Sequence, residues 1–282
     1  MIKLGWSEKW TLRFAVVALL FLALSGFEGM LMRSQQYDID ALHGMETLLN
    51  NLRPGDVEPT TPELYYAMLT AHPIVGIYGF IYMAVFGAFY FLVPFLVGKP
   101  VKHPKLVLTN FWLQIIGVMT CWAAGFFGLF NAMYTLYWPL PVSFDRVPVI
   151  GSIFFMLGAA AIMVNILLFS YNIFKTVLSK NGSGSYTLGQ FLRSAFGIPR
   201  LMKLFGKEDK KAVNLDYNGM PVFIVAVARG SVDTVINAIV LLLAGVLILV
   251  YGLFALFGNP LNPLAVDALI YKNIYWWGLD MV

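Results

Sequence analysis

The sequence predicts an all-α membrane protein, a polytopic bundle of transmembrane helices, on two observations. The chain of 282 residues is 59% hydrophobic and only 12% charged, whereas soluble domains carry about 25% charged residues. The apolar residues also gather in several runs of at least about 18 residues, each long enough to cross a bilayer as a helix. Composition and run length together exclude an ordinary soluble enzyme or binding domain.

Six spanning helices within one transmembrane domain, residues 1–282, are expected from these runs. We place them at about residues 11–33, 64–98, 107–133, 147–176, 222–257 and 264–282. The first run continues into MRSQQYDID without a small-residue cleavage site. It is therefore expected to remain as a helix rather than to be removed as a signal peptide.

The segment 177–218 is the one long polar stretch, between the fourth and fifth predicted helices. Its part LGQFLRSAFGIPRLMKLFG combines apolar residues at roughly helical spacing with basic residues. This pattern predicts an amphipathic helix in the cytoplasmic headgroup layer. A solvated basic loop is the alternative.

Basic residues gather in the N-terminal tail, around residues 99–105 and in the connection 175–229, whereas the loop between the first two helices is acidic. Lys and Arg favour the cytoplasmic side, so the N-terminus is expected in the cytoplasm. We separately expect the membrane to be a prokaryotic plasma membrane. The net charge of +4 then reflects contact with the lipid bilayer, and no nucleic-acid partner is expected. Cys121 is the single cysteine, so neither an internal disulfide nor a cysteine metal cluster is expected.

One histidine, His72, lies nine residues into the second predicted helix, in ELYYAMLTAHPIVGIYGF. At 1.5 Å per residue this is a depth of about 13 Å, where polar groups are costly and often functional. Imidazole is a common ligand of haem iron, but a packing histidine bonded to a neighbouring helix remains open on these residues alone. Pro73 removes a backbone N–H and bends the helix, which could aim the ring.

Three charged residues also stand within or at the end of apolar runs. Arg33 ends the first helix, where it would snorkel to the interface or hold a carboxylate in its guanidinium fork. Glu28 is flanked by Gly26 and Gly29, so another helix or a cofactor could approach it. It is a candidate for a proton path or a metal site, or for an ion pair with a neighbouring arginine. Asp280, in YWWGLDMV, needs a metal, a proton or a partner.

A longer motif begins at the histidine: Thr70-Ala71-His72 is followed by Val93-Pro94, Gly98, Pro104 and Asn110-Phe111-Trp112-Leu113. This order, over about 45 residues, resembles helices II and III of the catalytic subunit of the haem–copper oxidoreductases. That superfamily holds cytochrome oxidases, quinol oxidases and nitric oxide reductases. The fold it implies is the N-terminal half of the catalytic subunit, helices I–VI.

The resemblance implies that His72 is an axial ligand of a low-spin haem and that Arg33 lies beside the edge of that haem. It also implies electron transfer to a binuclear centre, made of a high-spin haem with copper or iron, where nitric oxide or dioxygen is reduced. The donor would be quinol or cytochrome c, acting through a cupredoxin-like or cytochrome electron-entry subunit. Two other hypotheses are a non-catalytic scaffold subunit and an ion transporter, although a transporter leaves the helix II–III match unexplained.

The C-terminal stretch DALIYKNIYWWGLD resembles the approach to helix VI of the family and places Asp280 where the first copper-ligand histidine stands. Asp280 and Glu28 are then the candidates for distal-metal or proton chemistry, since a carboxylate suits iron as well as copper. An alternative alignment puts Leu279 at this position, and the ligand is then missing.

Two departures from the family remain. The turn GKPVKHPKLVLTN lacks the family's acid and most of its asparagines, so the proton channel that they form is expected to be absent. The chain has about half the family's length, and the second axial ligand, the proximal ligand of the high-spin haem and the copper-binding histidine pair belong to later helices. Either another chain supplies those helices or the sequence is a fragment.

Overall fold

The computed structural model describes residues 5–37, 61–128, 130, 149–178 and 198–207, together with residues 47, 189, 193, 239, 243 and 246. All regular structure in these ranges is helical. The helices in chain order are α1 (Trp6–Gln36), α3 (Thr61–Pro73), the π-helix η1 (Ile74–Ile81), α4 (Tyr82–Val97), α5 (Pro104–Phe126), α6 (Val149–Leu178) and α8 (Ile198–Leu204). The predicted all-helical class is confirmed for the described part of the chain.

Four helical spans among the described residues are long and apolar enough to cross a membrane: Trp6–Gln36, Pro62–Phe95, Pro104–Phe126 and Ile150–Leu178. They correspond to the first four predicted helices, and a multi-pass integral membrane protein is thereby confirmed. The second span consists of α3, η1 and α4 in succession. The helices predicted over 222–257 and 264–282 lie outside the described residues, apart from residues 239, 243 and 246.

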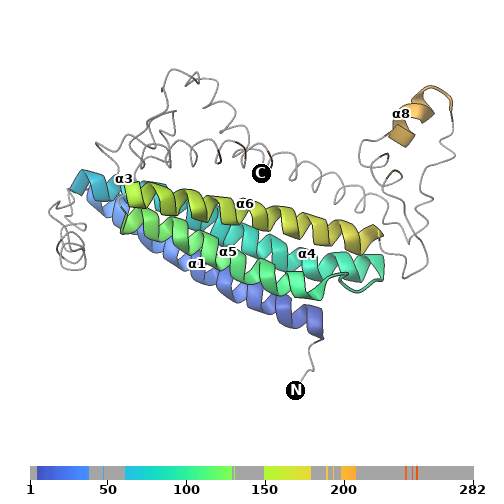
Figure 1. Cartoon of the computed structure of the whole chain (residues 1–282), viewed down its shortest axis with the longest axis horizontal. Helices are drawn as coiled ribbons and strands as arrows, with labels where there is room; N and C mark the ends of the chain where they lie inside the picture. The colour runs from blue at the N-terminus through green and yellow to red at the C-terminus, as the bar shows by residue number, and fades with distance from the viewer. Residues whose placement is uncertain are drawn as a thin grey trace.

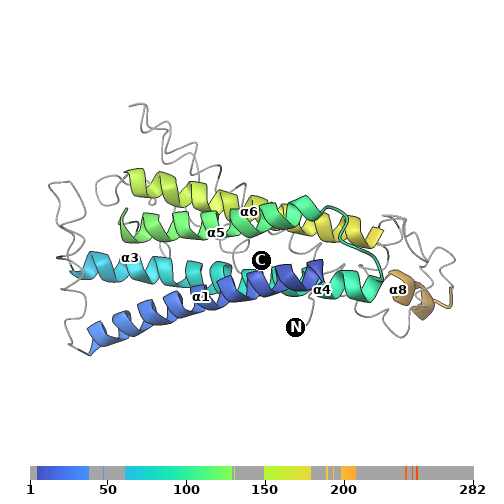
Figure 2. The same ribbon diagram turned by 90° about the horizontal axis from the view of Figure 1, so that it is seen from below.

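The spans lie side by side, and each runs antiparallel to the next (Figure 1). In the view from below, α1 lies along the span of α3, η1 and α4, and α5 lies along α6 (Figure 2). The two pairs are joined where α3 and η1 contact α5 and where α4 contacts α6. The arrangement therefore places the His72 region of α3 between α1 on one side and α5 on the other.

Helix α5 ends at Phe126, earlier than the expected end near residue 133, because α6 crosses close to it there. A Cβ atom on Gly128 would lie 2.4 Å from the Ala124 carbonyl oxygen and 2.7 Å from the Gly151 Cα atom of α6. The Gly128 N–H donates to the Ala123 carbonyl over 3.2 Å, one residue beyond α-helical spacing. Glycine at both positions lets the chain leave α5 against the backbone of α6.

Small residues of α5 and α6 also permit a close approach between the two helices at Gly158. A Cβ atom on Gly158 would lie 2.6 Å from Cys121 Sγ and 2.8 Å from both the Cys121 nitrogen and the Gly117 carbonyl oxygen. Small residues allow membrane helices to approach until their backbones touch. Cys121 is fully buried in this contact, and its thiol donates to the Phe155 carbonyl over 3.4 Å.

Buried amide side chains join α5 to α6 further along the same interface. Asn110 Nδ2 donates to Asn165 Oδ1 over 2.6 Å, and Asn165 Nδ2 donates back to the Asn110 carbonyl over 3.0 Å and to Gln114 Oε1 over 2.8 Å. The hydroxyl of Tyr90, on α4, donates to Asn110 Oδ1. The hydrocarbon core offers no water to satisfy such groups, so this reciprocal bonding fixes the register of the two helices.

The turn between α4 and α5 is fastened to the C-terminal end of α6. Gly98 ends α4 with φ 65°, a left-handed conformation that glycine adopts without steric cost. The ammonium group of Lys99 donates to the Val177 carbonyl over 3.3 Å, and burial lowers the pKa of this amino group. The Asn172 side chain bonds both the N–H and the carbonyl of His103, each over 3.1 Å. One end of the bundle is therefore closed by direct hydrogen bonds.

The Gly158 contact predicts the effect of adding one methyl group. Gly158→Ala should lower the free energy of unfolding by about 1–3 kcal/mol, because α5 and α6 must move apart or distort to admit the methyl group. Gly26→Ala is the matched control, since nothing lies within 4 Å of its Cβ position, and it should leave stability unchanged or raised. Denaturation of the detergent-solubilised chain, followed by tryptophan fluorescence, measures both. Equal stability of the two variants would contradict the packing described here.

Candidate functional site

His72 lies in the last turn of α3, and its side chain is partly buried against α1. Its Nδ1 atom is 2.9 Å from the Ser25 carbonyl oxygen and 3.2 Å from Ser25 Oγ, while the Ser25 hydroxyl donates to the His72 carbonyl over 3.3 Å. A carbonyl oxygen can only accept, so this contact requires the proton on Nδ1. In the neutral ring, Nε2 then carries the lone pair. Within the described part of the chain, no hydrogen bond to Nε2 occurs.

Two glycines let α1 and the His72 span approach each other closely. A Cβ atom on Gly29 would lie 3.2 Å from Cε1 of His72, and one on Gly76 would lie 2.9 Å from Ser25 Oγ. The Nδ1–Cε1 edge of the ring is therefore held against α1. Gly26, which also flanks Glu28 in the sequence, has nothing within 4 Å of its Cβ position, so only Gly29 serves the close approach that the sequence suggested.

The π-helix η1 starts directly after His72 and Pro73. At its end the Tyr82 N–H donates to the Ile77 carbonyl, five residues back, whereas an α-helix bonds four residues back. Within η1, the carbonyl of Tyr78 accepts a hydrogen bond from Gln114 Nε2 of α5 over 2.7 Å. Single-turn π segments often mark functional sites. Here the segment is tied to the buried amides of α5 and α6.

Arg33 lies on the exposed side of α1, one helical turn beyond Gly29 and so about 6 Å farther along the axis. Its guanidinium group donates to Gln36 Oε1 over 2.8 Å and to the Tyr37 hydroxyl over 3.0 Å. Gln36 in turn donates to the hydroxyl of Tyr65 on α3 over 2.6 Å. Arg33 and Tyr65 thus mark one end of the α1–α3 contact, and the contact between Ser25 and His72 marks the other.

Glu28 is buried, with 1% of its surface exposed. Its Oε1 atom accepts a hydrogen bond from the indole N–H of Trp122, on α5, over 2.6 Å, and its Oε2 atom has no hydrogen-bond partner among the described residues. The arginine partner considered for Glu28 is not found in this part of the chain, where Trp122 takes its place. A carboxyl group held this way, next to the residue that touches His72, is suited to hold a proton at Oε2.

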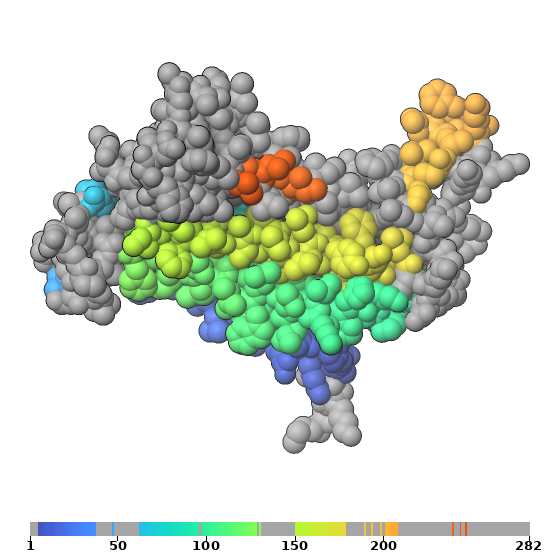
Figure 3. Space-filling view, in the orientation of Figure 1, coloured from blue at the N-terminus to red at the C-terminus, as the bar shows by residue number. Residues whose placement is uncertain are grey.

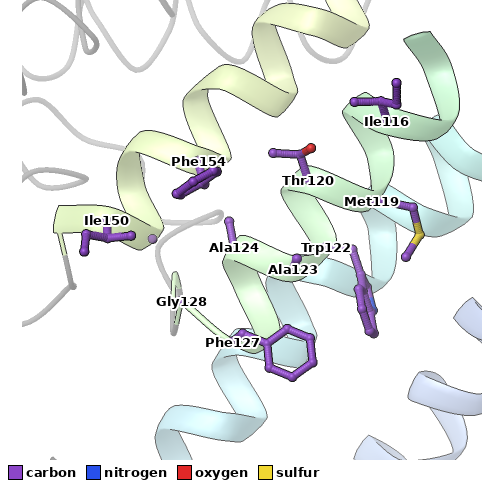
Figure 4. Close-up of a pocket in the computed structure, with 11 residues that line it drawn as sticks. Ile116, Met119, Thr120, Trp122, Ala123, Ala124, Phe127, Gly128, Ile150 and Phe154 are labelled. Carbon is purple, nitrogen blue, oxygen red and sulfur yellow. The ribbon is translucent and has the colours of Figure 1, made fainter. Parts of the chain in front are cut away.

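The same indole ring lines an apolar cavity of about 650 Å³ between α5 and α6. Ile116, Phe127 and Phe154 contribute to its wall, and Thr120 supplies a hydroxyl (Figure 4). Trp122 therefore separates the cavity from the buried acid. With an almost wholly apolar lining, the cavity does not suit a charged substrate.

The family comparison decides which kind of protein carries this site. The profile described as cytochrome c and quinol oxidase polypeptide I matches residues 9–279. The chain belongs to this family. No curated protein matches the chain.

Membership in the cytochrome c and quinol oxidase polypeptide I family confirms the resemblance found in the sequence and the membrane fold. The family is one of haem–copper oxidoreductases. Its members generally bind haems with copper or iron and act in membrane complexes with electron-donor subunits. Membership alone assigns no role to a particular residue of this chain.

The remaining sequence candidates are placed less fully. Asp280 lies outside the described residues. His103, the other histidine in the described part of the chain, is partly buried, and its ring stacks on Tyr171 with centroids 5.7 Å apart. No group of three or more His, Cys, Asp or Glu side chains that could hold a metal ion occurs among the described residues.

Sequence reasoning missed the buried amides that support the site. Asn110 and Gln114 lie four residues apart on α5, and Asn165 and Asn172 lie seven apart on α6, so each pair occupies one helical face. This spacing within apolar runs was the available signal. Of the four, only Asn110 belongs to the sequence motif on which the resemblance to the family rests.

Trp122→Phe tests whether the indole N–H stabilises the buried acid. The variant should have a free energy of unfolding about 1–3 kcal/mol lower than that of the native chain, because Glu28 loses its hydrogen-bond donor. Trp112→Phe, at an indole that is 53% exposed, is the matched control and should have little effect. Chemical denaturation in detergent compares the two. A Trp122→Phe variant as stable as the control would show that the bond contributes nothing.

Proposed function

We propose that this chain is the haem-binding part of a membrane respiratory terminal reductase that reduces nitric oxide or dioxygen. The observation that carries the proposal is the hydrogen bond between His72 Nδ1 and the Ser25 carbonyl, which leaves Nε2 without a partner in the described part of the chain. Family membership supplies the class of reaction. Together they favour His72 as a ligand over His72 as a packing residue.

The residues around His72 fit an axial ligand of a low-spin haem. Histidines that bind metals usually donate their other ring N–H to a carbonyl or carboxylate, which fixes the tautomer and raises ligand basicity. Ser25 serves that role here, and the missing side chain of Gly29 leaves room for the ring. When bound, the haem iron would accept and pass on single electrons. Nε2 of His72 would be its ligand from this chain.

The charged residues nearby would manage the charge that accompanies electron transfer. Arg33, one turn beyond Gly29, is the cation available to pair with haem propionates through its planar fork. Glu28 would hold or release a proton at Oε2, the oxygen without a partner among the described residues. An uncompensated charge inside the membrane is costly, so a proton acceptor near the haem ligand would lower the cost of adding an electron.

The rest of the proposed enzyme lies beyond the residues described. We propose Asp280 as a ligand of the distal metal, or as a proton donor to it, beside a high-spin haem and copper or iron. Helices that carry the second axial ligand and the copper-binding histidine pair would come from another chain or segment. Electrons would arrive from quinol or cytochrome c, through a cupredoxin-like or cytochrome subunit.

Replacing His72 tests the assignment in the assembled complex. His72→Ala should abolish the low-spin haem signal in the optical spectrum and lower the haem content measured by pyridine haemochrome, because the iron loses its ligand from α3. His103→Ala is the matched control, as His103 lies at the start of α5 and stacks on Tyr171, and it should keep full haem content.

An unchanged spectrum in the His72→Ala complex would refute the ligand role and favour a scaffold subunit that holds no haem. Loss of assembly in both variants would instead point to a general folding defect. The complex should therefore first be compared with the native one by size-exclusion chromatography.

A further inference from the structure

The short helix α8, Ile198–Leu204, has residues at both ends that favour its start and its stop. Pro199 stands in its first turn, where a missing N–H is harmless. Just after its end, Gly206 has φ 68°. The Gly206 N–H donates to the Lys203 carbonyl, and the Lys207 N–H donates to the Met202 carbonyl. This pair of bonds around a left-handed glycine is a Schellman motif, which ends helices sharply. The helix therefore ends sharply here, within the stretch LGQFLRSAFGIPRLMKLFG for which the sequence predicts an amphipathic helix.

Large apolar side chains of α8 and of the residue after it are not covered by the described part of the chain. Leu201 is 56% exposed, Leu204 is 82% exposed and Phe205 is 74% exposed. Spacings of three and four residues place them on one helical face. Exposed apolar clusters mark surfaces that bind a partner or a membrane.

Positive charge surrounds that apolar face. Lys203 and Lys207 are exposed, and the guanidinium group of Arg193 contacts the Met202 sulfur over 3.5 Å. From Lys175 to Lys207 the sequence holds six basic residues and no acidic one. The complementary surface is therefore anionic, with apolar material directly beneath it.

Helix α8 also lies near the end of the bundle, where the spans would meet the lipid headgroups. It stands beyond the end of the bundle at which α4 and α6 finish (Figure 1) and projects from the bundle in the space-filling view (Figure 3). The basic residues Lys99, Lys102, Lys105 and Lys175 belong to the same end. Because the spans cross the bilayer, the headgroup layer is within reach of α8 at a high local concentration.

We propose that α8 docks on the bilayer surface by binding anionic phospholipids. Leu201, Leu204 and Phe205 enter the boundary between headgroups and acyl chains, while Lys203 and Lys207 pair with lipid phosphates. A basic residue near an anionic membrane surface favours the bound state about fivefold. Amphipathic helices with apolar and basic faces bind membranes in this way. The proposal does not depend on haem binding.

A fluorescent label on α8 tests the proposal in the full chain, reconstituted into nanodiscs. Leu204→Cys can be labelled with an environment-sensitive maleimide dye, since the natural Cys121 is fully buried. Phosphatidylcholine discs are compared with discs that hold equal amounts of phosphatidylcholine and phosphatidylglycerol. The readouts are the emission wavelength and quenching by acrylamide from the water side.

Two double variants, made in the labelled chain, test how docking depends on the charge of α8. Lys203→Glu with Lys207→Glu reverses the two charges on α8. Lys102→Glu with Lys105→Glu makes the same change at exposed positions of the same end of the bundle, outside α8.

We expect the label to be blue-shifted and protected from acrylamide only in the anionic discs. The α8 double variant should weaken docking by more than about 25-fold, two factors of five, and the control double variant should leave docking intact. A label equally open to acrylamide in both kinds of disc would overturn the proposal in favour of a solvated loop. Protection that ignores lipid charge and the α8 lysines would also overturn it, since another part of the protein would then cover the helix.

Discussion

The hydrogen bond from His72 Nδ1 to the Ser25 carbonyl is the constraint on which the site depends. It fixes the tautomer of the ring, holds the ring edge against α1 and leaves Nε2 as the atom with a lone pair. It also requires α1 and α3 to approach closely, which Gly29 and Gly76 permit. Glu28 and Arg33 lie on the same helix as Gly29, one residue before it and four residues after it.

The second pair of helices keeps this contact in place. Gln114 donates to the Tyr78 carbonyl of the π-helix, and Asn165 of α6 donates to Gln114 in turn. Glu28 of α1 is tied to α5 through Trp122. Polar groups in a bilayer must find partners within the protein, so these few bonds connect all four described spans and fix where the His72 segment sits.

The sequence predicted features that depend on local length and composition. Apolar runs located the first four spans, and the Thr-Ala-His motif with its following turn indicated the family. Features that depend on partners distant in the sequence could not be predicted from local patterns. Trp122 bonds Glu28 across 94 positions, and Gln114 bonds the Tyr78 carbonyl of the π-helix across 36 positions. The early end of α5 likewise depends on Gly151 of α6. Local hydropathy cannot predict it, because hydropathy does not report which backbone packs nearby.

Chemical rescue of the missing ring tests the central claim most directly. A His72→Gly complex has space where the imidazole stood, and it can be purified with and without added imidazole. If Nε2 of His72 binds the iron, the low-spin haem absorption should be lost without imidazole and should return when imidazole is added. Native-like low-spin haem in the His72→Gly complex before any imidazole is added would contradict the account.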